Sequence, residues 1–173
     1  MKSLFKGLIV LSMVWGGMAF AQNLSDADIG EIMKVVNDAE IDAAKAAKSR
    51  ADHKEVQDFA KHMIDEHEKN IKEGKDVFKE ANIKPRSNDT AKNMKEDAKR
   101  KLDDLKKQKK GAEFDRAYIG TQVSMHQQVL NELNQVYIPA TRDPRVKAYL
   151  EKTRDHVQQH LSKAQELQSK LVQ

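Results

Sequence analysis

Apolar residues recur every three or four positions along four stretches of the chain, with charged residues between them. That spacing is typical of amphipathic α-helices that bury one face. It predicts four long helices, over residues 25–50, 52–82, 112–137 and 143–173. Two of the links are only a few residues long, so the helices that they join must pack as antiparallel neighbours.

Residues that favour helix starts stand at the beginning of these stretches. Ser25 and Asp52 each precede an acidic residue by three positions, which is the arrangement of a capping box. Asp143 is followed directly by a proline, a residue favoured at the first helical position. These signals place the helix starts independently of the apolar pattern.

A long crossover separates the second predicted helix from the third. Pro85 breaks the chain, and a highly charged segment over residues 90–110 then has only a narrow apolar stripe, ended by Gly111. Such a stripe suits an extra helix on the outside of a bundle. The sequence therefore predicts an all-α protein, a ferritin-like four-helix bundle whose long crossover contains an extra charged helix.

The composition agrees with this fold. Charged residues make up 34% of the chain, the mean hydropathy is −0.78, and glycine and proline occur only 7 and 3 times. Long, solvated helices have this profile, whereas a sheet protein needs more turn residues. Aromatic residues make up 5%, so we expect a thin, mostly aliphatic core.

Residues 1–21 have the pattern of a secretory signal peptide. The basic start MKSLFK is followed by the apolar run GLIVLSMVWGGMAF and then by small residues up to Ala21, after which we expect cleavage. The apolar run is short for a membrane span, so we expect no stable membrane insertion after signal removal. The prediction is a periplasmic or secreted protein with a single domain over residues 22–173.

Cysteine content and charge argue against several kinds of function. The chain has no cysteine, so neither disulfides nor thiolate chemistry are available. It has 31 basic and 27 acidic residues, and two of the basic ones belong to the predicted signal peptide, which leaves a net charge of +2. We therefore expect no nucleic acid as a partner. A nucleophile–base pair or a phosphate-binding loop is not apparent, so catalysis ranks last among the functions considered.

One polar residue interrupts the apolar face of each predicted helix. At about 100° per residue, His67 falls within about 20° of the centre of its face and His126 within about 40°. Glu40 and His160 are similarly placed on the first and last helices. All four lie at comparable depth along their helices, so we expect them to converge near mid-height. His62 falls on the far side of the helix that carries His67, and is expected in solvent.

These four residues suit a transition-metal ion. A buried carboxylate and three imidazoles are costly unless they hold an ion or satisfy one another. Three histidines and a glutamate can form a tetrahedral zinc site, although copper and iron accept the same ligands. His156, one turn before His160, is a possible extra ligand. The alternative is a metal-free structural or interaction bundle with a buried His/Glu polar layer.

A di-iron or copper redox protein is a further alternative, but its centres fit less well. A ferritin-type di-iron centre needs Glu-x-x-His pairs, and no histidine follows Glu40 at that spacing. A haemerythrin-like set of His62, Glu66, His156 and His160 requires His62 to point inward, against its predicted facing. Copper is favoured by nearby methionines, which at these spacings usually fill a core.

Three segments resemble successive blocks of the domain of unknown function 4142 family: VQDFAKHMIDEHEKN, EFDRAYIGTQVSMHQQVLNEL and DPRVKAYLEKTRDHVQQHLSKAQEL. The likeness spans residues 26–167, and the family pattern falls on the same glutamate and three histidines. It also marks Asp115 and Tyr118, as packing and hydrogen-bonding residues near a helix start. The sequence TRDH before His160 and the basic segment 90–110 depart from the pattern. The resemblance implies an exported bacterial protein with a ferritin-like helical fold, and no particular activity. The leading hypothesis is an envelope metal-binding protein in metal or stress tolerance.

Overall fold

The computed structural model describes residues 24–171, and within that range the chain forms helices and no strands. The all-α class predicted from the sequence is thereby confirmed. The predicted signal peptide, residues 1–21, lies outside the described residues. The elements are α1 Asp26–Arg50, α2 Lys54–Glu80, α3 Asp89–Lys107, α4 Ala112–Glu132, a π-helical turn Leu133–Tyr137 (η2), α5 Ile138–Ala140 and α6 Pro144–Leu171.

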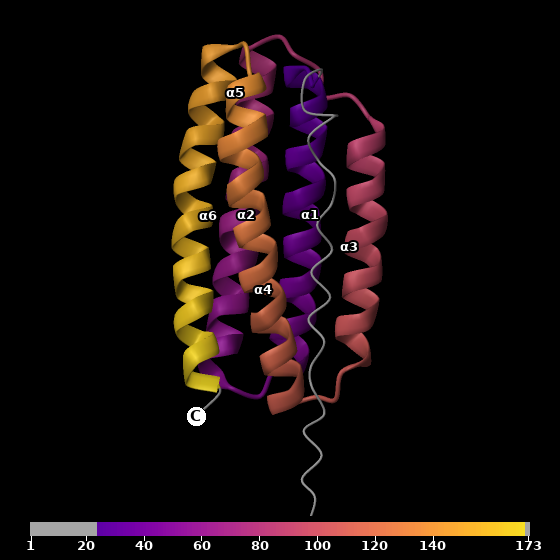
Figure 1. Ribbon diagram of the computed structural model, residues 1–173, viewed down its shortest axis with the longest axis vertical. Helices are drawn as coiled ribbons and strands as arrows, with labels where there is room; N and C mark the ends of the chain where they lie inside the picture. The colour runs from indigo at the N-terminus through magenta and orange to yellow at the C-terminus, as the bar shows by residue number, and fades with distance from the viewer. Residues whose placement is uncertain (1–23, 172–173) are drawn as a thin grey trace, which may run out of the picture.

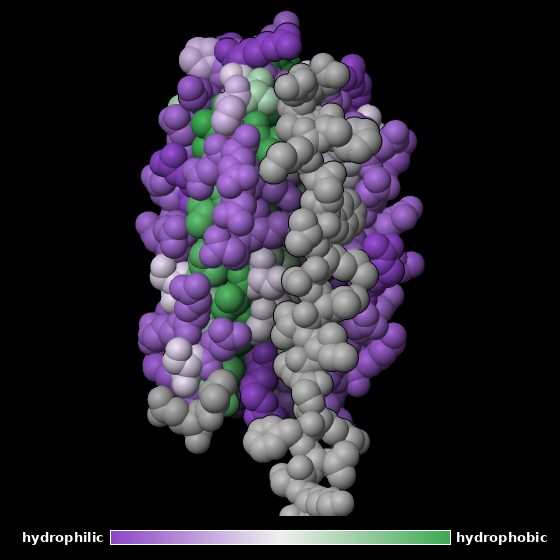
Figure 2. Space-filling view, viewed as in Figure 1, coloured by the Kyte–Doolittle hydropathy of each residue, from purple (hydrophilic) through white to green (hydrophobic). Residues whose placement is uncertain are grey.

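The long helices lie side by side along the longest axis of the molecule (Figure 1). Short links at residues 51–53 and 141–143 make α1 and α2 one hairpin, and α4 and α6 a second one. Helix α2 packs against α6 and α1 against α4, which closes a core between the two hairpins. Figure 2 shows hydrophilic side chains over most of the face in view, with a hydrophobic strip in the region of α4 and α6. Among the described residues, no helix is both long and apolar enough to cross a membrane.

Helix α3 lies outside this core, next to α1 (Figure 1). Only Ala91 and Leu105 of α3 are buried, which agrees with the narrow apolar stripe expected from the sequence. The helix ends at Lys107, four residues before Gly111. Gly111 has a φ of +92° and precedes the first residue of α4. Its prediction as the end of the charged helix was wrong, because its backbone conformation serves the start of the next helix instead.

Two of the predicted helix starts are confirmed, and one is wrong. Ser25 forms the complete capping box at the start of α1. Asp143 accepts a hydrogen bond from the backbone N–H of Arg145 at 2.9 Å, at the start of α6. Asp52 does not cap α2, whose N-cap residue is His53 with no side-chain cap bond.

Aspartates from the opposite hairpin hold the two short turns instead. Asp115, in the first turn of α4, accepts hydrogen bonds from the backbone N–H groups of Asp52 and His53 at 3.1 and 2.9 Å. Asp26, in the first turn of α1, accepts from the N–H groups of Arg142 and Asp143 at 3.0 and 2.9 Å. Each hairpin therefore binds the turn of the other. A hydrogen-bonding role near a helix start was expected for Asp115, but its partners in the other hairpin were not.

The core has two apolar clusters with a polar layer between them. The upper cluster, around Ile32, Leu133 and Leu150, lies at the end of the bundle where α5 is found. The lower cluster, around Phe114 and Leu167, lies at the opposite end. Between them is a set of buried polar residues, here called the polar layer: Asn37, Glu40, His67, Asn70, Gln122, His126, Thr153 and His160.

Candidate metal centre

Three histidines from three helices meet inside the polar layer. His67 comes from α2, His126 from α4 and His160 from α6, and their exposed fractions are 6%, 2% and 6%. The ring centroids lie 5.4, 5.5 and 6.0 Å apart. One ligand nitrogen of each ring lies within 4.8 Å of one from each of the others. The structure thus brings together three of the four residues expected to converge.

Hydrogen bonds fix the tautomer of His67. Its Nδ1 lies 2.8 Å from Oδ1 of Asn37, and Nδ2 of Asn37 donates to the carbonyl oxygen of Met33 at 2.7 Å. Because a carbonyl oxygen only accepts, the Asn37 amide has a single consistent orientation, in which its Oδ1 accepts from His67. Nδ1 of His67 therefore carries the hydrogen, and Nε2 has a free lone pair. This Nε2 is buried without a hydrogen-bond partner among residues 24–171.

A buried chain of hydrogen bonds holds Asn37 in turn. Asn37 also donates to Oδ1 of Asn70 at 2.9 Å, and Asn70 donates to Oγ1 of Thr153 at 2.9 Å. The hydroxyl of Tyr149 donates to Oδ1 of Asn70 at 2.7 Å. Gly74 makes room for this hydroxyl, since a Cβ there would lie 2.9 Å from it. These bonds link α1, α2 and α6 at the height of the three histidines.

The backbone of α4 fixes His126, and Glu40 stands behind it. Nδ1 of His126 lies 3.0 Å from the carbonyl oxygen of Gln122, so Nδ1 carries the hydrogen and Nε2 has the free lone pair. Nε2 is buried, and nothing in the described part of the chain bonds to it. Oε1 of Glu40 lies 3.8 Å from Nδ1 of His126, and Oε2 accepts from Nε2 of Gln122 at 2.8 Å. Glu40 is thus buried beside the set of three converging nitrogens, on the Nδ1 side of His126.

Burial keeps His67 and His160 neutral. Desolvation, followed by the proximity of His126 and His160, holds the pKa of His67 well below its usual range. Desolvation, with smaller contributions from His126 and His62, lowers the pKa of His160 to about 3. Nδ1 of His160 is buried and has no hydrogen-bond partner within residues 24–171. A neutral imidazole with a free lone pair is the form that binds a metal ion.

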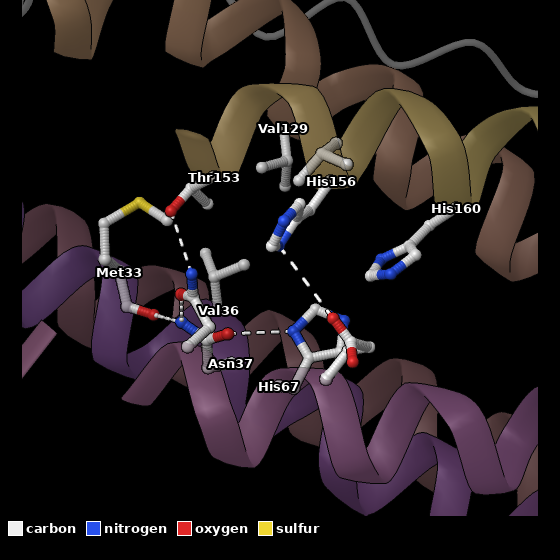
Figure 3. Close-up of a pocket in the computed structure, with 11 residues that line it drawn as sticks. Met33, Val36, Asn37, His67, Val129, Thr153, His156 and His160 are labelled. Atoms are coloured by element: carbon white, nitrogen blue, oxygen red, sulfur yellow. Dashed lines mark hydrogen bonds and ion pairs between the residues drawn. The ribbon is translucent and has the colours of Figure 1, made fainter. Parts of the chain in front are cut away.

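A cavity of about 20 Å³ adjoins His67 and His160 between α2 and α6, which is room for about one water-sized particle. In Figure 3, His67 points from α2 toward α6, and His156 and His160 point from α6 toward α2. Glu66 and His156 also line the cavity and are partly exposed, with exposed side-chain fractions of 21% and 35%. Oε2 of Glu66 lies 4.0 Å from Nδ1 of His156.

His62 is exposed, as its helical facing predicted. Its ring is nevertheless close to the site, since its centroid lies 5.7 Å from that of His160. A helical side chain leans toward the N-terminus of its helix and covers neighbouring surface, so a facing angle alone misses such a contact. His62 therefore lies outside the buried site but against one of its rings.

Comparison with known proteins places the chain in a family. A family model described as Domain of unknown function (DUF4142) matches residues 17–167, which is most of the chain. The chain belongs to the DUF4142 family. Searches of curated proteins and of solved structures found no match for it. All residues of the polar layer fall inside the matched range.

Sequence reasoning missed several polar residues around the three histidines of this DUF4142 protein. Asn37, Asn70, Gln122 and Thr153 are buried and hydrogen-bonded around the histidines. The sequence contains a signal for most of them, because three stand three or four positions from Glu40, His67 or His126 and so share a helical face. Tyr118, marked by the resemblance, is buried with its hydroxyl lacking a bond to the described residues, and burial raises its pKa well above the usual value.

Proposed function

We propose that this protein is an exported, periplasmic or envelope protein with a ferritin-like bundle that binds one transition-metal ion, zinc first. The observation that carries the proposal is the set of three buried imidazole nitrogens that have no hydrogen-bond partner among residues 24–171. Burying a polar group without a bond is costly, and native structures rarely keep several such groups at one point. A metal ion would satisfy all three.

The proposed ligands are Nε2 of His67, Nε2 of His126 and Nδ1 of His160. A tetrahedral zinc ion with Zn–N bonds of about 2.0–2.1 Å holds its nitrogens roughly 3.3–3.4 Å apart. Each of the three residues offers a nitrogen within 4.8 Å of those of the other two, so the set would contract by up to about 1.4 Å around such an ion. Zinc sites with three histidine ligands and a water molecule in the fourth position are well known.

Glu40 fits a supporting role better than a ligand role. Its carboxylate oxygens contact Gln122 and Nδ1 of His126, the nitrogen opposite to the proposed ligand atom. A carboxylate behind a metal-bound histidine orients the ring and raises its basicity. Asn37 does the same for His67 through its Oδ1. A water molecule in the cavity that adjoins His67 and His160 would complete the coordination.

Imidazole ligands favour zinc but also accept copper and iron. Met63 belongs to the lower apolar cluster, which agrees with its role as core filling. Met33 also lines the cavity, with its thioether at the Thr153 end rather than beside His160 (Figure 3). A protein of this kind would hold metal in the envelope, in support of metal or stress tolerance.

The second candidate is a metal-free bundle in which the polar layer sets the register of the helices. It is favoured by the hydrogen bonds among Asn37, Asn70 and Thr153, which join α1, α2 and α6 without an ion. Buried polar networks of this type specify a unique packing in other bundles. The network leaves the three histidine nitrogens unpaired, which is why we place this candidate second.

Elemental analysis and thermal unfolding distinguish the two. The purified protein is analysed for zinc, copper and iron, stripped with a chelator, and titrated with each ion. A ligand present at 100 times its Kd stabilises the fold by about 2.7 kcal/mol, so the Tm should rise by several degrees with zinc. If no metal co-purifies and none of the three ions changes the Tm, the metal proposal is wrong and the metal-free bundle stands.

A further inference from the structure

The three proposed ligands are almost fully buried, so an ion needs a route to them. Their exposed fractions are at most 6%, and apolar clusters lie above and below. Moving a divalent ion through an apolar layer without compensating groups is very costly. The polar side chains between α2 and α6 offer a different route, because the cavity that adjoins His67 and His160 is lined there by partly exposed residues.

Three residues on this side carry metal-binding groups that the proposed site does not use. They are His62, Glu66 and His156, here called the outer cluster. Glu66 and His156 line the cavity, with 4.0 Å between Oε2 and Nδ1. His62 is exposed, with its ring against that of His160 at 5.7 Å between centroids. The outer cluster therefore extends from the protein surface to the buried ligands His67 and His160.

We propose that the outer cluster is a second, weaker cation site that captures the ion at the surface and passes it to His67 and His160. The inference rests on the proposed function of the buried site. Glu66 supplies the negative charge that a partly dehydrated cation needs, and the two histidines supply exchangeable ligands. The ligand atoms of the three side chains do not all lie within 4.8 Å of one another, as those of the buried histidines do. This wider spacing suits transient binding of an ion rather than storage.

The hydrogen bonds of Glu66 fit this role. Nζ of Lys69 donates to Oε1 at 2.8 Å, so the carboxylate has a cationic partner on its own helix. Oε2 faces His156 at 4.0 Å. The side chain of Lys69 is 72% exposed, so an arriving cation can displace its ammonium group into water. Lys69 thus holds the carboxylate in place until a cation replaces it.

The same pair of helices provides a matched control. Glu73 lies on α2 two turns after Glu66, and both of its carboxylate oxygens accept from Nζ of Lys152 on α6, at 2.7 and 2.8 Å. Like Glu66, it is a partly exposed carboxylate that pairs across from α2 to α6. It does not line the cavity beside the histidines. Glu73→Gln therefore changes the charge of α2 equally without touching the outer cluster.

The test separates the rate of metal uptake from the affinity. Metal-free protein is mixed by stopped flow with Zn²⁺ buffered by a chromophoric chelator, and the equilibrium Kd is measured with the same chelator. For Glu66→Gln and His156→Gln we expect uptake to slow by about tenfold or more, as charged groups change association rates by 10–10³. Release should slow to a similar extent, so the Kd should change less than about threefold. Glu73→Gln should behave as wild type, and Lys69→Gln should take up zinc faster.

Each outcome decides between the two proposals. If wild type binds no zinc, the proposed function fails and the uptake role with it. If wild type binds zinc and both outer variants load at the wild-type rate, the uptake role is overturned while the buried site stands. If His156→Gln weakens the Kd at least tenfold with an unchanged uptake rate, His156 is a permanent ligand, and the uptake role is again overturned. Circular dichroism melting of the metal-free variants confirms that each is folded.

Discussion

The lower cluster and the polar layer occupy neighbouring heights on the same helices, yet different forces hold them. In the lower cluster, Phe114 and Leu167 are 0% exposed and pack against other apolar side chains. In the polar layer, directed hydrogen bonds hold the rings of His67 and His126 and the amides around them, and three ring nitrogens have none within residues 24–171. The lower cluster stabilises by burying apolar area, whereas the polar layer retains a cost that a bound metal ion would remove. That contrast separates the part of the core that folds the chain from the part proposed to bind.

The largest expected effect is the loss of metal binding when one proposed ligand is removed. His67→Ala should abolish zinc binding, measured by calorimetric titration of the chelator-stripped protein. His62→Ala, five positions away on the same helix, should leave the equilibrium affinity near that of wild type, because His62 is exposed. Equal losses from the two substitutions would contradict the assignment of ligands by burial.

The lower cluster should respond in the opposite way. Phe114→Ala removes a fully buried ring, and such substitutions typically cost about 3–5 kcal/mol of unfolding free energy. The zinc affinity of the folded variant should remain within a few-fold of wild type, because Phe114 does not touch the histidines. The checks are urea denaturation with chelator present and zinc titration of the same sample. A large drop in affinity would show that the two regions are coupled.

Acid should weaken the polar layer before it affects the carboxylates. The pKa values of His67 and His160 are lowered in the fold, that of His160 to about 3. The unfolded chain, with a histidine pKa of about 6.5, therefore takes up protons that the fold excludes. This contribution of His160 to stability is complete above about pH 6.5 and is lost by about 1.4 kcal/mol per pH unit as the pH falls toward its folded pKa of about 3. His67 contributes in the same direction.

Denaturation in urea at several pH values between 7.5 and 4.5, with chelator present, measures this slope. A His160→Gln variant should lose part of it, while Phe114→Ala should lower stability by a constant amount across the range. Parallel curves for wild type and His160→Gln would mean that the buried imidazole does not govern the acid response.

The smallest effect should come from the residues behind the ligands. Asn37→Leu removes the acceptor that fixes the tautomer of His67. Loss of such a supporting contact typically weakens metal binding about 10–100-fold. Asn131→Leu, an asparagine on an exposed part of α4, serves as the control and should leave the affinity unchanged. An unchanged affinity in Asn37→Leu would remove Asn37 from the site.

The sequence could predict features that depend on a single helix, but not contacts that depend on how two helices pack. Helical facing correctly predicted that His67, His126 and His160 are buried and that His62 is exposed, because these depend on one helix at a time. The partner of Glu40 was not predictable, since it depends on how far α1 is shifted along α4 and how each is rotated. The hydrogen bonds that hold the link between α1 and α2 were missed for the same reason. The acidic residue that binds it, Asp115, lies on another hairpin.

The reciprocal aspartates have a consequence for the order of folding. Asp115 binds a turn 62 and 63 positions earlier in the chain, and Asp26 binds one 116 and 117 positions later. The acceptors for these turn N–H groups come from the other hairpin, so the hydrogen bonds of each turn are completed only when the two hairpins have docked. Contacts between such distant positions slow folding and make it cooperative. We therefore expect the two hairpins to gain and lose protection from hydrogen exchange together, as a single unit rather than as two halves.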